Sequence, residues 1–286
     1  MRSSISSSSH AFLWVAGVVF IGLFVSFNLF LVLCSPTYGL ITRNPALSRL
    51  QQYFLAGPAV REDTVVVGSS LPAMLSERGL GPHVRNLSFP GHSSIVGIDL
   101  LRRASYVPKR LLIEAFVVRD PAEFQDANVL DPASLFLAGA VPSSQPNQMP
   151  VSLVIGGIQE AAGMRKEPVF RGYPAGQIPE VPETSAEQKE NLHRWIASAV
   201  PILQWFESQG TELVFFTMPH HPEYPTVVDR VAVAEYQATF PPDRYLWIPN
   251  LPGDYEWTDG LHMTRASGEE YAKRIRLFVD RADKSM

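Results

Sequence analysis

Residues 11–34 restrict the fold of this chain more than any other segment, because they form a long apolar run, AFLWVAGVVFIGLFVSFNLFLVLC, without a charged side chain. A helix needs about 20 apolar residues to cross the hydrocarbon core of a bilayer. The apolar region of a cleaved signal peptide is only about 7–15 residues long and is followed by a small-residue cleavage site. We therefore expect residues 11–34 to be an uncleaved transmembrane signal anchor after an N-terminal tail of residues 1–10.

The charges that flank this span say little about its orientation. Arg2 precedes the span, and Arg43 and Arg49 follow it, so the positive-inside rule barely separates the two orientations. The short N-terminal tail favours translocation of the large C-terminal part. We expect a single-pass membrane protein whose C-terminal domain is extracytoplasmic, either periplasmic or at the cell surface.

The composition argues against several classes of function. The net charge is -4 and there is no basic run, so the chain lacks the electrostatic footprint of a nucleic-acid-binding protein. Cys34 is the only cysteine, which excludes an internal disulfide and a cysteine cage for a metal ion. No motif implies a cofactor.

Residues 61–286, after a stem of residues 35–60, have the pattern of an α/β domain. Short apolar runs that are typical of buried parallel strands alternate with segments of helical periodicity. The expected strands are residues 64–67, 83–89, 110–118, 211–219 and 244–250, and the expected helices are residues 93–106, 184–210 and 267–282. We predict a three-layer α/β/α sandwich with a parallel, flavodoxin-like sheet.

Local signals indicate where two of these helices begin. Ser185 and Gln188 have the spacing of a capping box, and Ser267 and Glu270 repeat that spacing near the last helix. Residues 119–182 are instead rich in proline and contain the apolar stretch VSLVIGGI, and we expect an insertion of loops with one short helix. The insertion is either a lid over the site or, as we favour, a packed surface excursion.

Polar residues follow each expected strand, at the edge where parallel sheets bind their ligands. They are Ser69 and Ser70 after the first strand, Pro90-Gly91-His92 after the second, Arg119 and Asp120 after the third, His220 and His221 after the fourth, and Asp259 and His262 beyond the fifth. We expect a functional site where these residues converge.

The segment TDGLHMT, residues 258–264, contains the parts of a general base. Asp259 and His262 are three residues apart, so the carboxylate can hold one ring nitrogen protonated and leave the other free to accept a proton. A serine hydroxyl becomes a nucleophile when such a base is within hydrogen-bond reach, and Ser70 can provide it. The backbone amides of Ser70 and Gly91 would then face the oxyanion of a tetrahedral intermediate.

Simpler explanations exist for several of these residues. Ser70 alone would be a strand-end cap, and Ser93, a rival nucleophile, more readily caps the following helix. His220 and His221 look like a metal-binding pair, but neighbouring histidines at a strand end point apart and no carboxylate cluster accompanies them, so we expect no metal site. We assign these histidines, with Arg119, to substrate binding or to structure. The Gly-x-Ser-x-Gly elbow of α/β-hydrolases is absent.

Three blocks of the sequence resemble the SGNH/GDSL hydrolase superfamily. They are Gly68-Ser69-Ser70, Asn86-Leu87-Ser88-Phe89-Pro90-Gly91 and Asp259-Gly260-Leu261-His262. The first block normally reads Gly-Asp-Ser, and the Gly-Ser-Ser variant is similar to that of membrane-anchored members. The chain looks most like the cell-envelope proteins of alginate O-acetylation and D-alanine transfer, which carry one N-terminal span and an SGNH domain outside the membrane. The family's third block, Gly-x-Asn-Asp, is missing, and EAFVVRDP stands in its place.

The resemblance implies a serine acyl-transfer enzyme, either an O-acetyl esterase or an O-acetyltransferase, that acts on a cell-envelope or extracellular polysaccharide. Ser70 would be the nucleophile, His262 the base and Asp259 its orienting carboxylate. Without the family's asparagine, the oxyanion hole has two donors unless Arg119, Asn128 or His220 adds one. The alternative is a catalytically weak or inactive SGNH-like module that binds a glycan or a membrane-bound O-acyltransferase. A metal-dependent hydrolase that uses His220 and His221 is a third, weaker hypothesis.

Overall fold

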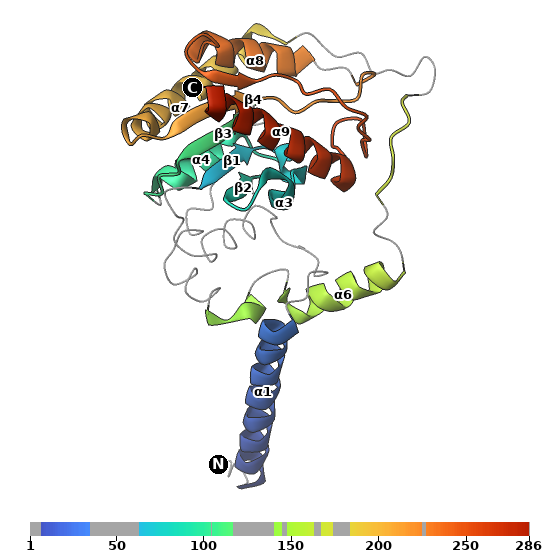
Figure 1. The fold of residues 1–286 in the computed structure, drawn as a ribbon. Coiled ribbons are helices and arrows are strands. Elements are labelled where there is room, and N and C mark those ends of the chain that lie inside the picture. Colours follow the sequence, from blue (N-terminus) through green and yellow to red (C-terminus); the bar gives the residue numbers. More distant parts are fainter. Residues whose placement is uncertain are drawn as a thin grey trace. The chain divides into compact units, whose positions relative to one another are not determined.

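The computed structural model describes residues 7–34, 63–103, 105–116, 140–144, 148–162, 167–173, 184–224 and 227–285. The predicted stem, residues 35–60, lies outside this part of the chain, and so do Arg119 and Asn128. The chain divides into two compact units, which are shown in Figure 1. One consists of Met1–Asn44 and Asp131–Arg165, and the other of Pro45–Leu130 and Lys166–Met286.

The first unit contains the apolar N-terminal segment and part of the predicted insertion. Its described elements are α1 (Ser7–Cys34), the 3-10 turn η4 (Pro142–Ser144) and α6 (Pro150–Ala161). Residues His10–Cys34 form a helix that is long and apolar enough to cross a membrane, as the sequence predicts. Helix α6 contains the stretch VSLVIGGI, so the short helix expected within the insertion is present.

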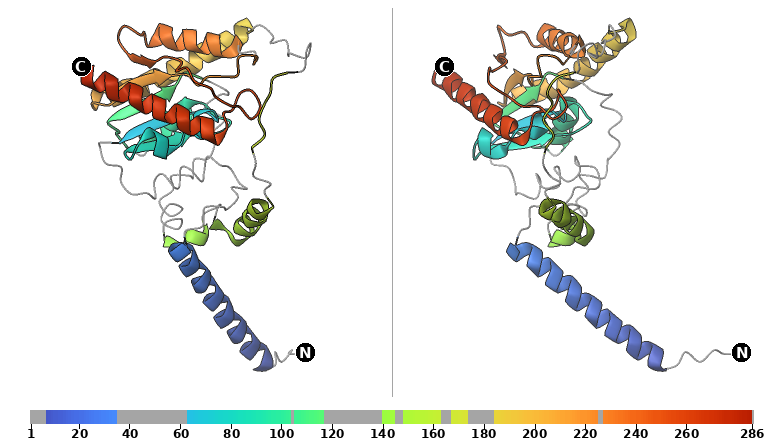
Figure 2. Two further views of the ribbon diagram at one scale, coloured as in Figure 1. Left: turned by 45° about the vertical axis from the view of Figure 1, so that its right-hand side comes forward. Right: turned by 90° about the vertical axis from the view of Figure 1, so that its right-hand side faces the viewer.

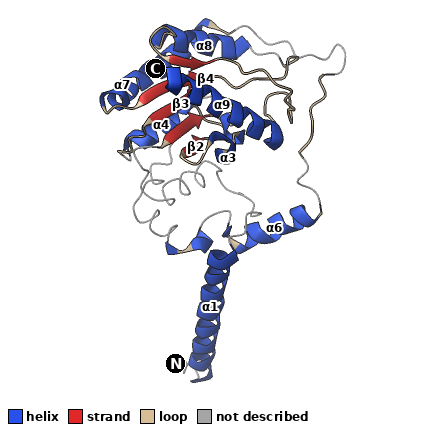
Figure 3. Cartoon of the chain, viewed as in Figure 1, coloured by secondary structure: helices blue, strands red, loops and turns tan. Residues whose placement is uncertain are grey.

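The second unit is built on a parallel sheet of five strands. In the described part of the chain these are β1 (Thr64–Gly68), β2 (Val84–Ser88), β3 (Arg110–Glu114), β4 (Glu212–Phe216) and β5 (Leu246–Ile248). They lie in the order β2-β1-β3-β4-β5, and every neighbouring pair is parallel (Figure 3). The predicted α/β fold and parallel sheet are confirmed. The order reverses at β1, which lies between β2 and β3, and ligands of such sheets bind at this position.

Two hydrophobic clusters pack the strands of this unit against its helices. The described helical elements are η1 (Pro72–Met74), α3 (Glu77–Leu80), α4 (Ser94–Arg103), α7 (Ala186–Ser208), α8 (Val227–Thr239) and α9 (Arg265–Ser285). Val65 and Val67 of β1 pack in one hydrophobic cluster with α4, α7 and α8, whereas Val66 packs in another with α3 and α9. In the right-hand view of Figure 2, α9 (red) and α7 (gold) accordingly lie on different sides of the sheet. The alternation follows from the two-residue period of a strand.

The capping box at the start of α7 is present as predicted. Ser185 Oγ accepts a hydrogen bond from the Gln188 amide at 3.1 Å, and Gln188 Oε1 accepts one from the Ser185 amide at 2.8 Å. These bonds satisfy two amides that the first turn of a helix leaves without partners.

The last helix begins at Arg265, two residues before the predicted start, but the capping box predicted at Ser267 is wrong. The carbonyl of Thr264 accepts the Gly268 amide at 2.8 Å, and its hydroxyl accepts the Ser267 amide at 3.3 Å, so Thr264 caps the helix. The Ser267 hydroxyl instead accepts the amide of Glu256 at 2.8 Å. Ser267 therefore holds the preceding loop and does not form a capping box.

An ion-pair cluster around the buried Arg110 joins β3, β4 and α9 at the N-terminal edge of the sheet. The Arg110 guanidinium is only 8% exposed and lies 2.6 Å from Glu212 Oε2 and 2.5 Å from Asp283 Oδ1. Burial by itself would lower the pKa of Arg110, but the hydrogen bonds that it donates to these two carboxylates raise the pKa overall, so the side chain stays charged.

We expect Arg110→Met to destabilise the full-length protein by about 1–2 kcal/mol, because it removes the hydrogen bonds to two partly exposed carboxylates. Urea unfolding in detergent, followed by tryptophan fluorescence, measures this loss. Arg103→Met is the matched control, because it removes an exposed (i, i+4) pair with Asp99 and should cost no more than about 0.5 kcal/mol. Equal losses in the two variants would contradict the role of the Arg110 cluster.

Candidate active site

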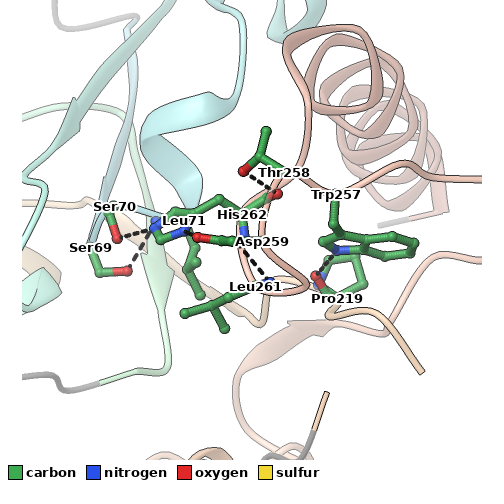
Figure 4. Close-up of polar contacts among 9 residues, drawn as sticks. All are labelled: Ser69, Ser70, Leu71, Pro219, Trp257, Thr258, Asp259, Leu261 and His262. Atoms are coloured by element: carbon green, nitrogen blue, oxygen red, sulfur yellow. Dashed lines mark hydrogen bonds and ion pairs between the residues drawn. The ribbon is translucent and has the colours of Figure 1, made fainter. Parts of the chain in front are cut away.

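Ser70 is the serine that β1 presents to the site, and its neighbour Ser69 is held away from it. The Ser69 side chain is fully buried, and its hydroxyl accepts the amide of Leu71 at 3.2 Å. The Ser69 amide donates to Glu114 Oε2 at 2.6 Å, which fixes the backbone just before Ser70 to the end of β3. Ser70, the next residue, is partly exposed, so its hydroxyl is accessible to a ligand (Figure 4).

The end of β1 leaves no room for a side chain at Gly68. A Cβ at this position would lie 2.8 Å from Glu114 Oε2 and would also overlap Pro72. On the other side, the buried Asn86 of β2 donates from Nδ2 to the carbonyls of Pro72 and Leu75, at 2.7 and 2.9 Å. The turn that carries Ser70 is thus held from both neighbouring strands.

His262 lies in a closed loop between the two sides of a small antiparallel bridge. Trp257 and Met263 form the bridge, and within it the Thr258 amide donates to the His262 carbonyl at 2.8 Å. The Thr258 hydroxyl donates to the same carbonyl at 3.2 Å. These contacts fix the backbone of His262 independently of its ring.

Asp259 shapes the tip of the loop with one oxygen and reaches the imidazole with the other. Its Oδ1 accepts the amides of Leu261 and His262 at 2.9 and 2.7 Å. Its Oδ2 lies 2.7 Å from His262 Nδ1. Gly260 between them has φ +88°, a backbone conformation that L side chains rarely adopt.

Ser70, His262 and Asp259 form one continuous chain of hydrogen bonds. Ser70 Oγ lies 2.7 Å from His262 Nε2, and His262 Nδ1 lies 2.7 Å from Asp259 Oδ2 (Figure 4). An ionised carboxylate can only accept a hydrogen bond, so Nδ1 carries the ring proton and Nε2 is left to accept from the Ser70 hydroxyl. The structure therefore brings together the three side chains that the sequence selects, in the arrangement of a general base beside a nucleophile.

Hydrogen bonds keep Asp259 ionised. Partial burial would on its own raise the pKa of this carboxyl, but the backbone and ring hydrogen bonds from His262 and the amide of Leu261 outweigh it and lower the pKa below its usual value. The Asp259 side chain is 54% exposed, so water screens the charge as well. The orienting group of His262 is thus negatively charged throughout the neutral range.

Residues 167–173, which lie within the predicted insertion, contact the loop that carries His262. The Phe170 amide donates to the Trp257 carbonyl at 2.6 Å. Glu167 accepts the backbone amide of Arg265 at 2.7 Å and pairs with its guanidinium at 3.2 Å. A Cβ on Gly260 would lie 3.0 Å from the Phe170 ring, so this ring covers the tip of the loop.

His221 and His220 support the same loop from the end of β4. The His221 amide donates to the Gly260 carbonyl at 2.9 Å, and its ring packs edge-on against Phe170 and Trp257. The His221 Nδ1 accepts the amide of Glu223 at 3.2 Å. His220 stacks on the Tyr224 ring, with 6.3 Å between the ring centroids. The sequence predicts either substrate binding or a structural role for these histidines. The contacts of His221 are structural.

Gly91 and Ser93 follow β2 in the turn next to the end of β1. The Phe89 amide donates to the Gly68 carbonyl at 2.8 Å, and the His92 amide returns to the Phe89 carbonyl at 3.0 Å. Gly91 is therefore held near the residue that precedes Ser69. Ser93 is buried at the start of α4, where its carbonyl accepts the Val96 amide at 3.2 Å, so it is inaccessible as a rival nucleophile.

Several residues that position the site have no motif of their own. Glu114 is the one acidic residue of the strand RLLIE and is fully buried. A lone carboxylate beside apolar residues is the only local signal that it has a hydrogen-bond partner. Glu167 and Phe170 lie in a proline-rich segment without periodicity, so no sequence pattern indicates their contacts. Among the described residues, no group of three or more His, Cys, Asp or Glu side chains is placed to hold a metal ion.

The fold and the site together define an α/β protein with a hydrogen-bonded Ser-His-Asp group at the carboxyl edge of a parallel sheet. Neither a protein-family model nor a curated protein matches the chain.

The lowered pKa of Asp259 predicts how stability depends on pH. Asp259→Asn keeps an oxygen for the two backbone amides but loses the charge that His262 faces, so the variant should be less stable than the wild type at pH 7. Because the folded-state pKa lies below the unfolded one, this difference is fully present above about pH 4 and shrinks as the pH falls through the lowered value.

Thermal unfolding of both proteins between pH 3 and pH 7 measures this difference, with pH values chosen around the ordinary aspartate pKa of about 3.9. Asp254→Asn, at an exposed position near the same loop, is the control and should change stability by less than about 0.5 kcal/mol. A difference between wild type and Asp259→Asn that grows on acidification would show that the carboxylate is not stabilised as described.

Proposed function

We propose that this protein is a membrane-anchored serine acyl-transfer enzyme of the SGNH type. The observation that carries the proposal is the unbroken hydrogen-bonded chain from Ser70 through His262 to Asp259, with both contacts at 2.7 Å. A serine hydroxyl without such a base is a weak nucleophile, and an imidazole without an orienting carboxylate lacks a fixed tautomer.

Each residue has one role in the reaction. Ser70 Oγ attacks the ester carbonyl while its proton moves to His262 Nε2, which gives a tetrahedral intermediate. Collapse breaks the bond to the alcohol oxygen, and His262 returns the proton to that oxygen, which leaves an acyl group on Ser70. Asp259 holds the ring in place and stabilises its charged form. A second hydroxyl group, of water or of a sugar, then gives its proton to His262 and attacks the acyl group. The bond from the acyl carbon to Ser70 Oγ breaks, and His262 returns the proton to Ser70 Oγ.

The amides of Ser70 and Gly91 are the proposed donors to the oxyanion. Among the described residues neither amide donates a hydrogen bond within the protein, so both are available to a ligand. The Phe89–Gly68 hydrogen bond supports a position for Gly91 beside the serine turn. Two backbone donors suffice for the oxyanion holes of serine proteases, and Arg119, Asn128 and His220 remain further candidates.

The arrangement of the sheet supports the family assignment. We propose that the second unit is a three-layer α/β/α sandwich of the SGNH kind, because its strand order is that of flavodoxin-like sheets and two hydrophobic clusters cover the two faces. Ser70 follows β1, at the reversal of the strand order. In the third position, where the family carries Gly-x-Asn-Asp, this chain has Glu114, whose carboxylate already accepts the Ser69 amide.

The proposed substrate is an O-acyl group, acetyl above all, on a cell-envelope or extracellular polysaccharide. The resemblance to alginate-acetylation and D-alanine-transfer proteins supports this substrate and an extracytoplasmic domain, and helix α1 supports attachment to the membrane. Water as the second acceptor makes the protein an esterase, and a sugar hydroxyl makes it a transferase. A membrane-bound O-acyltransferase is the proposed partner in the second case.

The second candidate is a binding module that keeps the shape of the site without the chemistry. The absence of Gly-x-Asn-Asp favours it, since one lost oxyanion donor costs about a hundredfold or more in rate. Such a module would bind the glycan or the membrane-bound acyltransferase through the same edge of the sheet.

A fluorophosphonate probe separates the two candidates, because it reacts covalently only with an activated serine. With full-length protein in detergent, we expect one adduct, located on Ser70 by peptide mass spectrometry. Ser70→Ala should abolish it, and Asp259→Asn, which leaves the ring in the wrong tautomer, should slow labelling by about 10³–10⁴-fold.

Ser93→Ala is the matched control, because it removes the rival serine and should leave the labelling rate unchanged. His262→Ala should prevent labelling although Ser70 is still present. A folded wild-type protein that remains unlabelled would favour the binding module, and an adduct on another serine would refute the assignment of Ser70.

A further inference from the structure

Helix α6 in the first unit presents an apolar face outwards. Val151, Val154, Ile155 and Ile158 are 38–61% exposed. Their spacing of i, i+3, i+4 and i+7 places all four on one side of the helix. A helix at the surface of a water-soluble domain has the opposite pattern, with its apolar stripe inside and polar side chains outside.

The other side of α6 is buried. Ser152 and Leu153 are buried, and so is Gly156. The helix therefore has one buried side and, separate from it, an exposed apolar stripe. Its exposure matches that of the apolar side chains along α1, such as Val18 and Val32, which belong to the segment that is able to cross a membrane.

The first unit ties α6 to the C-terminal end of α1. The Ser143 amide in η4 donates to Asn28 Oδ1 at 3.0 Å. Asn28 lies six residues before the end of α1, about 9 Å along the helix axis. Leu31 in the same turn is only 2% exposed, unlike the neighbouring Leu29 and Val32. Turn η4 therefore contacts the span close to the depth at which the span leaves the hydrocarbon core.

The short connection from η4 keeps α6 near that depth. Helix α6 begins at Pro150, seven residues after Ser143, and a fully extended chain of this length reaches about 25 Å. Figures 1 and 2 show α6 beside the C-terminal end of α1 within this unit. An apolar helix held at the edge of a bilayer has lipid as its nearest apolar phase.

We propose that α6 is an interfacial membrane helix, which lies in the bilayer surface and inserts the side chains of Val151, Val154, Ile155 and Ile158 among the lipid acyl chains. The helix is too short to span the membrane, which requires about 20 residues, and it suits a position at the boundary between headgroups and acyl chains.

The absence of basic residues defines the kind of lipid surface. Many interfacial helices carry Lys and Arg on their polar face and need anionic lipids. Residues 140–162 contain neither Lys nor Arg. Insertion of α6 therefore depends on apolar burial and on attachment to α1, and it proceeds in a bilayer of neutral phosphatidylcholine at any ordinary salt concentration.

The test places a fluorescent reporter on the outward face of α6. Cys34 is the only cysteine, so Cys34→Ser gives a background for single-cysteine variants of the full-length chain. Ile155→Cys is labelled with an environment-sensitive dye, and the protein is reconstituted into phosphatidylcholine vesicles. Val151→Cys is a second reporter on the same face. Lys189→Cys, at an exposed position of α7, is the matched control.

We expect the dye at Ile155→Cys and at Val151→Cys to be quenched by lipids with a nitroxide near the top of the acyl chain. Mid-bilayer nitroxides should quench it less, and aqueous iodide should not reach it. Lys189→Cys should show the reverse, with quenching by iodide alone. Anionic lipid or high salt should change neither result.

Two results would overturn the proposal. Quenching of both α6 reporters by iodide, to the extent seen at Lys189→Cys, would show a helix in water. Protection from iodide together with no quenching by lipid nitroxides would show that protein, such as a second copy of this chain, covers the face instead. Neither readout uses Ser70 or His262, so the outcome is independent of the proposed acyl transfer.

Discussion

The hydrogen bond between Ser70 Oγ and His262 Nε2 joins two loops that are 192 residues apart in the chain. Neither loop holds this geometry alone, since a serine after a strand and a histidine in a loop are free to rotate. The parallel sheet brings the two ends to one edge, and local contacts then fix each side to within hydrogen-bond distance. Contacts from the rest of the second unit therefore position both partners of this hydrogen bond.

Different contacts fix the two partners of this hydrogen bond. Glu114 and Asn86 reach across from the neighbouring strands to the turn that follows β1. The loop of His262 is closed by its own bridge, by the side-chain turn of Asp259 and by contacts with Phe170 and His221. Asp259 therefore has two functions, because one oxygen shapes the backbone and the other orients the imidazole.

Local and repeating signals made much of this structure predictable. Short β-branched runs identify the strands, Ser185 and Gln188 identify a helix start, and the spacing of Asp259 and His262 identifies the carboxylate–imidazole pair. What stayed unpredicted depends on partners distant in the chain. Thr264 caps α9, while the Ser267 hydroxyl accepts the amide of Glu256. Residues 167–173 contact the site through hydrogen bonds with backbone groups, which side-chain patterns do not predict.

The most direct measurement is the detection of a covalent acyl intermediate. Full-length protein in detergent is mixed with an activated acetyl ester, quenched in acid within the first turnover and digested for peptide mass spectrometry. An acetyl group on Ser70, absent in His262→Ala, is the result that a functioning Ser70–His262–Asp259 group predicts. A folded wild-type protein whose Ser70 stays unmodified, or that carries the acetyl group elsewhere, would contradict it.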